Sequence, residues 1–465
     1  MSEQAGPRDV VPVPAVEQPE LTHRLPKVRS RIVLNIRGRS MTLRGFKRPP
    51  TGMFTWLVVL GPGLIAALAG DDAGGIATYS SVGAKFGYEL LWMLLLITLS
   101  LAVVQEMCAR LGAATGRGLL DLVRERYGIG WALFAVAVVL LANCGVTVTE
   151  FAGIGAAMEL FGISKYLVVP LAAIIVWYLV IAGSYSRVEK IFLLMTLVFF
   201  AYPIAAILGR PDWGAVARGA LIPSLRMDPD YILLFVATVG TTITPYMQLF
   251  QQSTIVEKGV ARLHYGPERF DAYAGAIFSN MVAGFIIIAT GATLHAAGTT
   301  EVDSAAAAAQ ALQPVAGDFA QIIFAIGLLG ASLLAAGVLP LATAYSVSEA
   351  FGFRKGVNLD FRRAPIFLGL FSVLILIGAA IALIPNIPLI QLLVAIQTLN
   401  GILLPIILIF LLLLINDKRL VGDLGNSRLY NVLGCGTFTF VTIAVATLLG
   451  TQALRLVGVN ILGTG

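Results

Sequence analysis

Long apolar runs dominate the chain from Pro50 onward. Such runs are too long for strands and lack the period-two alternation of strands, whereas a spanning helix needs about 20 residues. The pattern predicts an all-α polytopic membrane protein whose transmembrane domain covers residues 51–465. Its eleven predicted spans lie near 53–83, 88–112, 128–160, 165–183, 188–208, 230–256, 271–297, 318–350, 365–384, 387–415 and 430–450.

Composition supports this prediction. Of the 465 residues, 58% are hydrophobic and 12% are charged, against about 25% charged in ordinary soluble domains. A soluble fold could not bury so much apolar surface, so a soluble enzyme and a disordered protein are excluded. Three cysteines and three histidines exclude a disulfide framework and a Cys/His zinc cluster.

The positive charges predict the orientation of the spans. The net charge is +6, but the excess Lys and Arg lie in alternate loops and not in a nucleic-acid-binding patch. Loops rich in Lys and Arg remain cytoplasmic, which predicts a cytoplasmic N-terminus and an external C-terminus in a cell membrane. The basic loops are Arg117–Arg126, Arg187–Lys190, Lys258–Arg269, Arg354–Arg363 and Lys418–Arg428.

Residues 1–50 are predicted to be a cytoplasmic tail, disordered at first and then basic. The first twenty are rich in Pro, Glu and Val, whereas Arg24–Arg48 holds nine Lys and Arg and no acid. Alternatively, this basic stretch binds anionic lipid.

Polar groups interrupt two of the apolar segments. Asp71 and Asp72 fall in the middle of the first, and Gly74 and Gly75 follow them. In the sixth, Thr238-Val-Gly-Thr-Thr-Ile-Thr-Pro-Tyr-Met-Gln248 contains the helix breaker Pro245. Interruptions five helices apart are typical of a transporter built from two inverted repeats, here 1–5 and 6–10.

Carboxylates, freed carbonyls and hydroxyls at bilayer depth indicate an oxygen-only cation site. A kinked packing helix whose aspartates pair elsewhere is the alternative. Glu150 in the third segment is either a second carboxylate near this site, a gate or a structural acid. Of Gln391 and Gln397 in the tenth segment, one is expected to face the site, although such residues also bridge helices.

These motifs together resemble the Nramp family of divalent-metal transporters. The likeness runs from about Gly61 to Leu413 and implies a LeuT-type fold, with helices 1 and 6 broken at midmembrane, and alternating access. It rests on the order and spacing of Gly61-Pro-Gly63, Asp72-Ala-Gly-Gly75, Ala109–Gly116, Thr149-Glu-Phe-Ala-Gly153, Thr244-Pro-Tyr-Met247, Leu333–Gly337, Glu349–Gly352, Gln391 and Gln397.

The resemblance implies a metal site at matching positions, with departures from the family pattern. The family's Asp is Asp72, its Asn is Gly75 and its Met is Thr244, and main-chain carbonyls would come from Ala69 and Thr241. Loss of the thioether removes a preference for soft metals over Mg²⁺. Smaller residues should also make the site roomier, which suits a partly hydrated Mg²⁺.

Four further residues extend this comparison. Asp71 would add charge if it faces inward, and Met247 is an alternative, displaced soft ligand. Tyr246 replaces a helix 6 His of the family and Thr147 a helix 3 Asp. Neither side chain titrates near neutral pH. The pattern is most similar to the Nramp-related magnesium transporters, which are not proton-driven.

The sequence therefore predicts a secondary transporter and not an enzyme. It would take up Mg²⁺ and Mn²⁺ as substrates, with no cofactor and no nucleic-acid partner, as a monomer in the lipid bilayer. A proton-coupled Mn²⁺/Fe²⁺ carrier, a LeuT-fold carrier of an organic solute such as an amino acid, and a non-transporting membrane protein are the alternatives. Al³⁺ also fits a hard oxygen site.

Overall fold

The computed structural model describes residues 32–36, 39–43, 67, 70–182, 201–260, 265–302, 304–310, 320–357, 359–385 and 388–456. Ala69, residues 53–66 of the first predicted span, residues 188–200 of the fifth and most of the N-terminal tail lie outside these ranges. The chain forms two units, Met1–Trp56 and Leu57–Gly465.

The first unit contains a β-hairpin that the sequence interpretation did not predict. Strand β1 (Ile32–Ile36) pairs antiparallel with β2 (Arg39–Leu43), with Ile32 opposite Leu43 and Ile36 opposite Arg39. β-branched residues favour such strands. The hairpin lies within the stretch that the charge pattern identified only as basic.

Within its described residues the second unit is helical and has no strand. Its helices are α3 (Ala73–Phe86), α4 (Leu91–Thr115), α5 (Leu119–Tyr127), α6 (Ile129–Glu159), α7 (Lys165–Ile181), α9 (Ala201–Leu208), α10 (Trp213–Leu221), α11 (Pro229–Thr242), α12 (Pro245–Glu257), α13 (Tyr265–Thr290) with the π-helix η3 (Gly291–His295), α14 (Ala305–Gln310), α16 (Ala320–Phe351), α17 (Pro365–Ala382), α18 (Leu389–Ile415), α19 (Lys418–Val421) with the 3₁₀-helix η5 (Gly422–Leu424), and α20 (Arg428–Leu456).

The described helices agree with the predicted spans. Eight helical stretches, α11 with α12 counted as one, are long and apolar enough to cross a membrane within the described part of the chain. Helices α3, α7 and α9 lie in the other three predicted spans and are shorter.

Both predicted interruptions are present, and in each a helix begins inside the bundle. Helix α3 begins after Asp72, which is its N-cap. Helix α11 ends at Thr242, and α12 begins at Pro245 after Thr244 in extended geometry (φ −68°, ψ 145°). Proline suits the first helical position because its missing N–H would have no helical partner there.

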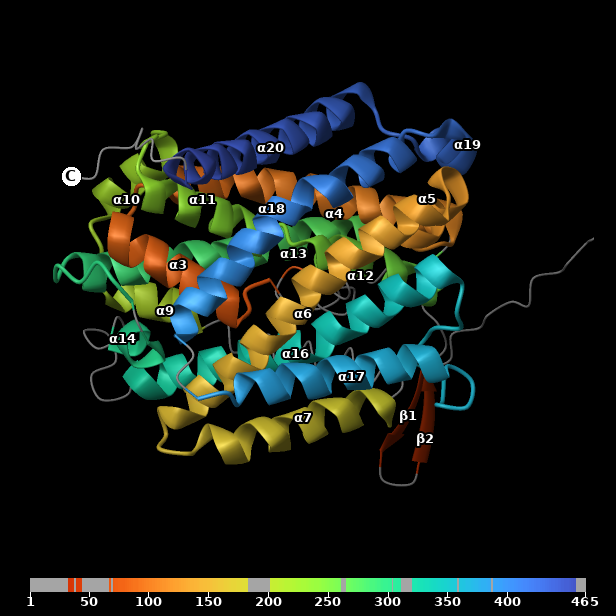
Figure 1. Cartoon of the computed structure of the whole chain (residues 1–465), viewed down its shortest axis with the longest axis horizontal. Helices are drawn as coiled ribbons and strands as arrows, with labels where there is room; N and C mark the ends of the chain where they lie inside the picture. Colours follow the sequence, from red (N-terminus) through yellow and green to blue (C-terminus); the bar gives the residue numbers. More distant parts are fainter. Residues whose placement is uncertain are drawn as a thin grey trace, which may run out of the picture. The chain divides into compact units, whose positions relative to one another are not determined.

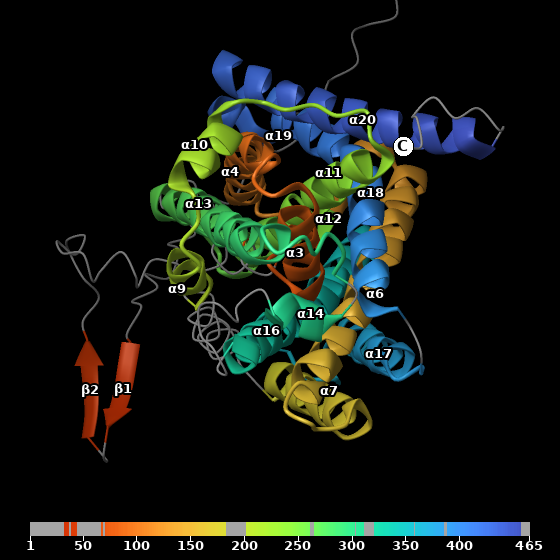
Figure 2. The same ribbon diagram turned by 90° about the vertical axis from the view of Figure 1, so that its left-hand side faces the viewer.

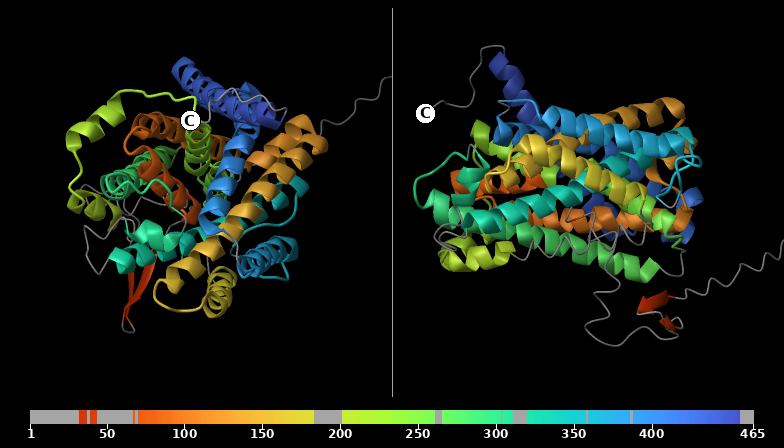
Figure 3. Two further views of the ribbon diagram at one scale, coloured as in Figure 1. Left: turned by 60° about the vertical axis from the view of Figure 1, so that its left-hand side comes forward. Right: turned by 90° about the horizontal axis from the view of Figure 1, so that it is seen from below.

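The interrupted helices lie inside the bundle. Helices α7 and α20 are at opposite edges, whereas α3, α11 and α12 are between them (Figures 1 and 2). Seen from below, the long helices run alongside one another (Figure 3). This arrangement surrounds the two helix starts with neighbouring helices.

Glycines allow the closest approach of two helices near the interruption. A Cβ at Gly240 of α11 would overlap the Gln397 carbonyl oxygen and the Gly401 nitrogen of α18, and one at Gly401 would lie 2.6 Å from the Val236 oxygen. Backbone-to-backbone packing therefore holds α18 against α11.

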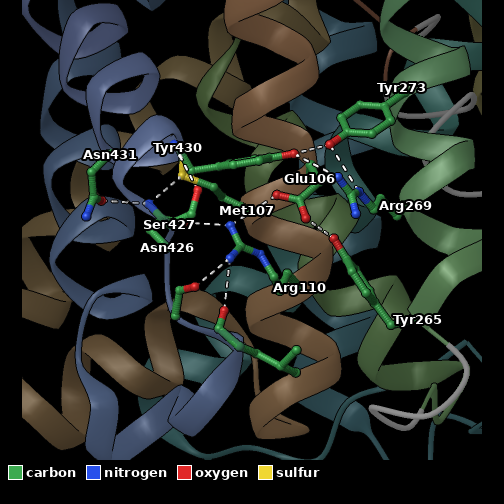
Figure 4. Close-up of polar contacts among 12 residues, drawn as sticks. Glu106, Met107, Arg110, Tyr265, Arg269, Tyr273, Asn426, Ser427, Tyr430 and Asn431 are labelled. Atoms are coloured by element: carbon green, nitrogen blue, oxygen red, sulfur yellow. Dashed lines mark hydrogen bonds and ion pairs between the residues drawn. The ribbon is translucent and has the colours of Figure 1, made fainter.

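A buried ion pair on α4 connects this helix to the segment before α20 (Figure 4). Arg110 Nη2 donates to Glu106 Oε2 at 3.1 Å, and both side chains are less than 10% exposed. The guanidinium also donates to the carbonyls of Leu424 (2.9 Å) and Gly425 (3.1 Å) and to Asn426 Oδ1. The Arg110–Glu106 ion pair on α4 is thus also hydrogen-bonded to η5 and to the residues that follow it.

Tyrosines extend the same network to α13 and α20 (Figure 4). Tyr265 donates to Glu106, and Tyr273 and Tyr430 share a hydrogen bond. The Arg110 guanidinium lies 5.0 Å from the centre of the Tyr430 ring, a distance typical of a cation–π contact. The network connects three helices that are distant in sequence.

The packing of α11 on α18 predicts that Gly240→Ala lowers the free energy of unfolding by about 1–3 kcal/mol or more, because main-chain atoms cannot make room for the methyl group. Gly436→Ala in α20 is the matched control, since nothing lies within 4 Å of a Cβ there. Thermal unfolding in detergent measures both. Equal unfolding temperatures for the two variants would contradict the packing argument.

The ion pair predicts that Arg110→Leu lowers the free energy of unfolding by about 3–5 kcal/mol, because Glu106 would be left buried without its cation. Arg363→Leu should cost about 0–1 kcal/mol, since its side chain is 70% exposed and 4.0 Å from Asp360. Chemical or thermal unfolding of both variants compares them. A small effect at Arg110 would show that α20 is held by apolar packing alone.

Candidate functional site

Asp72 is the centre of the site. Its Oδ1 accepts the Gly75 N–H at 2.6 Å, and Gln397 Nε2 of α18 donates to Oδ1 at 3.0 Å and Oδ2 at 3.3 Å. The side chain is fully buried. An Asp at this position satisfies the first turn of α3 and benefits from its dipole.

Gln397 is itself held in place. Its Oε1 accepts from Asn400 Nδ2 at 2.8 Å. Its amide end lies so close to α3 that a Cβ at Gly74 would overlap it. Of the two glutamines predicted in the tenth span, Gln397 is the one that the structure brings to Asp72.

Glu150 brings a second carboxyl group to the start of α3. Its Oε2 accepts the Ala73 N–H at 3.2 Å, and Thr149 Oγ1 lies 3.3 Å from Oε1. The carboxyl groups of Glu150 and Asp72 are neighbours, and Glu150 is also fully buried. Both acids are stabilised by the same helix N-terminus.

The break between α11 and α12 supplies oxygens from the other repeat. Thr241 Oγ1 donates to the Gly70 carbonyl at 3.2 Å, and the Thr241 carbonyl oxygen faces Gly70. Thr244 Oγ1 is buried and has no hydrogen-bond partner among the described residues. The two predicted interruptions therefore meet.

Gly75 does not leave the open space that the sequence suggested. A Cβ at this position would lie 2.6 Å from the Gly70 carbonyl oxygen and 3.1 Å from Thr241 Oγ1. Main-chain and hydroxyl oxygens have taken the volume that a larger residue would need. The expectation of a roomier site is wrong at Gly75, because the chain closes around the missing side chain.

Asp71 has both Ser279 and Asp72 as neighbours. It is fully buried beside Ser279 of α13, whose hydroxyl donates to the Ala67 carbonyl at 3.0 Å. Neither Asp71 oxygen has a hydrogen-bond partner within the described ranges. The carboxyl group of Asp71 is thus brought to α13 as well as to Asp72.

Of the other predicted site residues, one lies near Asp72 and another packs against a different helix. Tyr246 is buried near Asp72 and Glu150. Thr147 is buried but donates to its own helix at Asn143 O (2.7 Å) and packs on Gly378 of α17. Ala69 lies outside the described residues.

Gln391 is not brought to Asp72. It is exposed and lines a cavity of about 620 Å³ between α3, α11 and α18, together with the Lys85–Asp230 ion pair (2.5 Å). Six residues separate it from Gln397, and this distance along α18 moves it to the end of the helix.

Sequence reasoning missed Gln105 of α4. Its Nε2 lies 4.0 Å from Met247 Sδ, and the Met247 methyl group packs against Gly70. Met247 thus borders the first interruption, as the alternative of a displaced soft ligand requires. The sequence does contain a signal for Gln105, since a glutamine inside an apolar span is unusual.

Together these groups form a closed site with carboxylate, hydroxyl and carbonyl oxygens. Among the described residues no group of three or more His, Cys, Asp and Glu side chains could hold a metal. A bound cation would therefore depend on neutral oxygens and water in addition to Asp72. Hard divalent cations accept such ligands.

Two interrupted helices that meet inside one bundle define a polytopic membrane protein of the LeuT-type fold, with inverted repeats of five helices. The solved structure of MhsT in complex with L-phenylalanine shares this fold, with a TM-score of 0.57 and 14% identity over 87% of this chain and all of the other. Residues 63–451 match the family described as Natural resistance-associated macrophage protein-like, so this chain belongs to the Nramp family.

Two further proteins show the likeness. The divalent metal cation transporter MntH of Deinococcus radiodurans is 27% identical over 407 residues, which cover 84% of this chain and 89% of the relative. The manganese transporter of Eremococcus coleocola superimposes with a TM-score of 0.72 and 18% identity, over 89% of this chain and 91% of the other.

The hydrogen bonds to Asp72 predict that Gln397→Leu lowers the free energy of unfolding by about 1–3 kcal/mol in metal-free detergent, because a buried carboxylate loses a donor. Thr398→Val is the neighbouring control, since its hydroxyl donates only within α18, to Val394 O at 2.9 Å. Thermal unfolding compares the two. If both variants shift equally, Gln397 does not support Asp72.

Proposed function

We propose that this Nramp-family chain is a secondary transporter that takes up divalent cations, Mg²⁺ and Mn²⁺, by alternating access. The observation that carries the proposal is the fully buried Asp72 at the start of α3, next to the place where Thr241 of the α11–α12 break bonds to the Gly70 carbonyl. The names of the Deinococcus and Eremococcus proteins, a divalent metal cation transporter and a manganese transporter, support it.

The ligands that we assign are hard oxygens. Asp72 is the essential anionic ligand, and Thr244 Oγ1 and the Thr241 carbonyl are neutral ones, with Ala69 expected to contribute its carbonyl. Gln397 joins them when its amide oxygen turns toward the cation. Water completes the shell, as Mg²⁺ prefers. Oxygen ligands do not select against Mg²⁺ as a thioether would.

The driving force in this proposal is the membrane potential. Moving a divalent cation to the negative side of the membrane lowers its free energy by about 4.6 kcal/mol per 100 mV of membrane potential. Tyr246 and Thr147 stand where the family has titratable residues, and neither exchanges protons near neutral pH. Uptake therefore proceeds without proton coupling.

Met247 favours a second candidate, a proton-coupled Mn²⁺/Fe²⁺ carrier. Its side chain borders the first interruption at Gly70, so a small movement could bring a soft ligand to the cation. In that case Glu150, beside Asp72, would be the proton acceptor.

For orientation we propose a cell-membrane protein with the N-terminus and residues 1–50 in the cytoplasm and the C-terminus outside. The distribution of Lys and Arg between the loops supports this arrangement. The Glu257 end of α12 then faces the cytoplasm.

Proteoliposomes with an internal pH dye test the function. We expect uptake of both Mg²⁺ and Mn²⁺ without acidification, and loss of both with Asp72→Asn, because the neutral amide cannot balance the charge of the cation. Asp360→Asn is the control: Asp360 is 63% exposed and lies in the loop after α16.

Acidification during Mn²⁺ uptake, with Mg²⁺ not transported, would favour the proton-coupled carrier. The volume-conserving change Met247→Leu also distinguishes the uncoupled transporter from the proton-coupled carrier. It should leave Mg²⁺ and Mn²⁺ uptake unchanged in our proposal, whereas a soft ligand at Met247 predicts that uptake of Cd²⁺ is lost.

A further inference from the structure

One face of α12 carries polar side chains from the site toward its far end. Thr244, Gln248 and Gln251 are spaced by four and three residues and so share a face. They cover about 10 Å along the axis. Each is at most 1% exposed, and α12 packs against α4 and α16 (Figure 1).

The polar atoms of this face are unpaired. Thr244 Oγ1 and both amide atoms of Gln248 and Gln251 have no hydrogen-bond partner in the described part of the chain. Elsewhere on α12 pairing is partial: Gln252 Nε2 donates to Arg117 O at 2.8 Å and Thr254 Oγ1 to Phe250 O at 2.8 Å, whereas Gln252 Oε1 and the Tyr246 hydroxyl have no partner among the described residues.

Leaving these groups unpaired is costly. A buried polar group without a partner destabilises a protein by about 1–3 kcal/mol, and an apolar residue of the same shape would avoid that cost. Water or a hydrated ion, at two to four hydrogen bonds per water molecule, would satisfy such groups. The polar face of α12 is therefore better suited to line a water-filled path than to pack against apolar side chains.

A neighbouring helix adds a further oxygen. Gln105 Oε1 of α4 is fully buried and unpaired within the described residues, while its Nε2 approaches Met247 of α12 at 4.0 Å. Among the side chains of α12, from Pro245 to Glu257, only that of Glu257 is charged near neutral pH. The oxygens that Thr244, Gln248, Gln251 and Gln105 supply to the path are thus neutral, whereas the Glu349 carboxylate of α16 contacts Ser253 further along α12.

We propose that Thr244, Gln248 and Gln251 form the release path of the divalent cation from Asp72 toward the Glu257 end of α12. Their oxygens replace part of its hydration shell in turn. Neutral oxygens suit this task because a path must bind an ion well enough to admit it and weakly enough to release it. The assignment rests on the proposed transport function.

The double variant Gln248→Leu/Gln251→Leu tests the path in proteoliposomes with MnCl₂. We expect the maximal rate of Mn²⁺ uptake to fall by about fivefold or more, the rate equivalent of losing one hydrogen-bonding interaction in the transit step. Calorimetric Mn²⁺ binding to the detergent-solubilised variant should match the wild type, because Asp72 is untouched. Thr254→Val, on the same helix and paired internally, is the control.

A second measurement separates transport from folding. Because Leu removes unpaired polar atoms, the double variant should unfold at the same temperature as the wild type or higher. A lower unfolding temperature would show that the glutamines are structural and would overturn the path, as would an unchanged maximal rate beside Asp72-dependent wild-type uptake. Wild-type protein that transports neither Mg²⁺ nor Mn²⁺ would instead refute the proposed function.

Discussion

Backbone groups at two helix starts must be satisfied inside an apolar bundle, and the rest of the structure depends on how this is done. A helix leaves its first N–H groups without internal partners, and the side chains around these two helix starts are buried. Asp72 and Glu150 accept these donors at α3, and Pro245 removes one at α12. The acids that stabilise the fold are thereby also the acids available to a cation.

This shared use explains the chemistry of the site. Gly75 gives its space to the Gly70 carbonyl, and Thr241 bonds to that oxygen. In the proposed function, a cation would meet oxygen atoms that the fold already needs. The Met247 side chain lies beside Gly70, at the edge of this group of oxygens.

The network around Glu106 and Arg110 makes a different contribution. It lies on α4 and reaches α13 and α20 through tyrosines (Figure 4). Its charges are paired and hydrogen-bonded on several sides, whereas the face of α12 near Gln248 is unpaired. The paired groups around Arg110 connect helices, whereas the unpaired groups of α12 are the ones to which we assign the release path.

The sequence by itself determined the helical membrane architecture, the two interruptions and the position of Asp72 in the first of them, because apolar run length and Gly/Pro breaks are local properties of the chain. It also indicated Glu150 and Gln397 as candidates. Only the tertiary structure decided that these two meet Asp72 while Gln391 does not, that Asp71 faces α13, and that Gly75 leaves no free space. These outcomes depend on how closely distant helices approach, and this distance is set by the packing of all of them together.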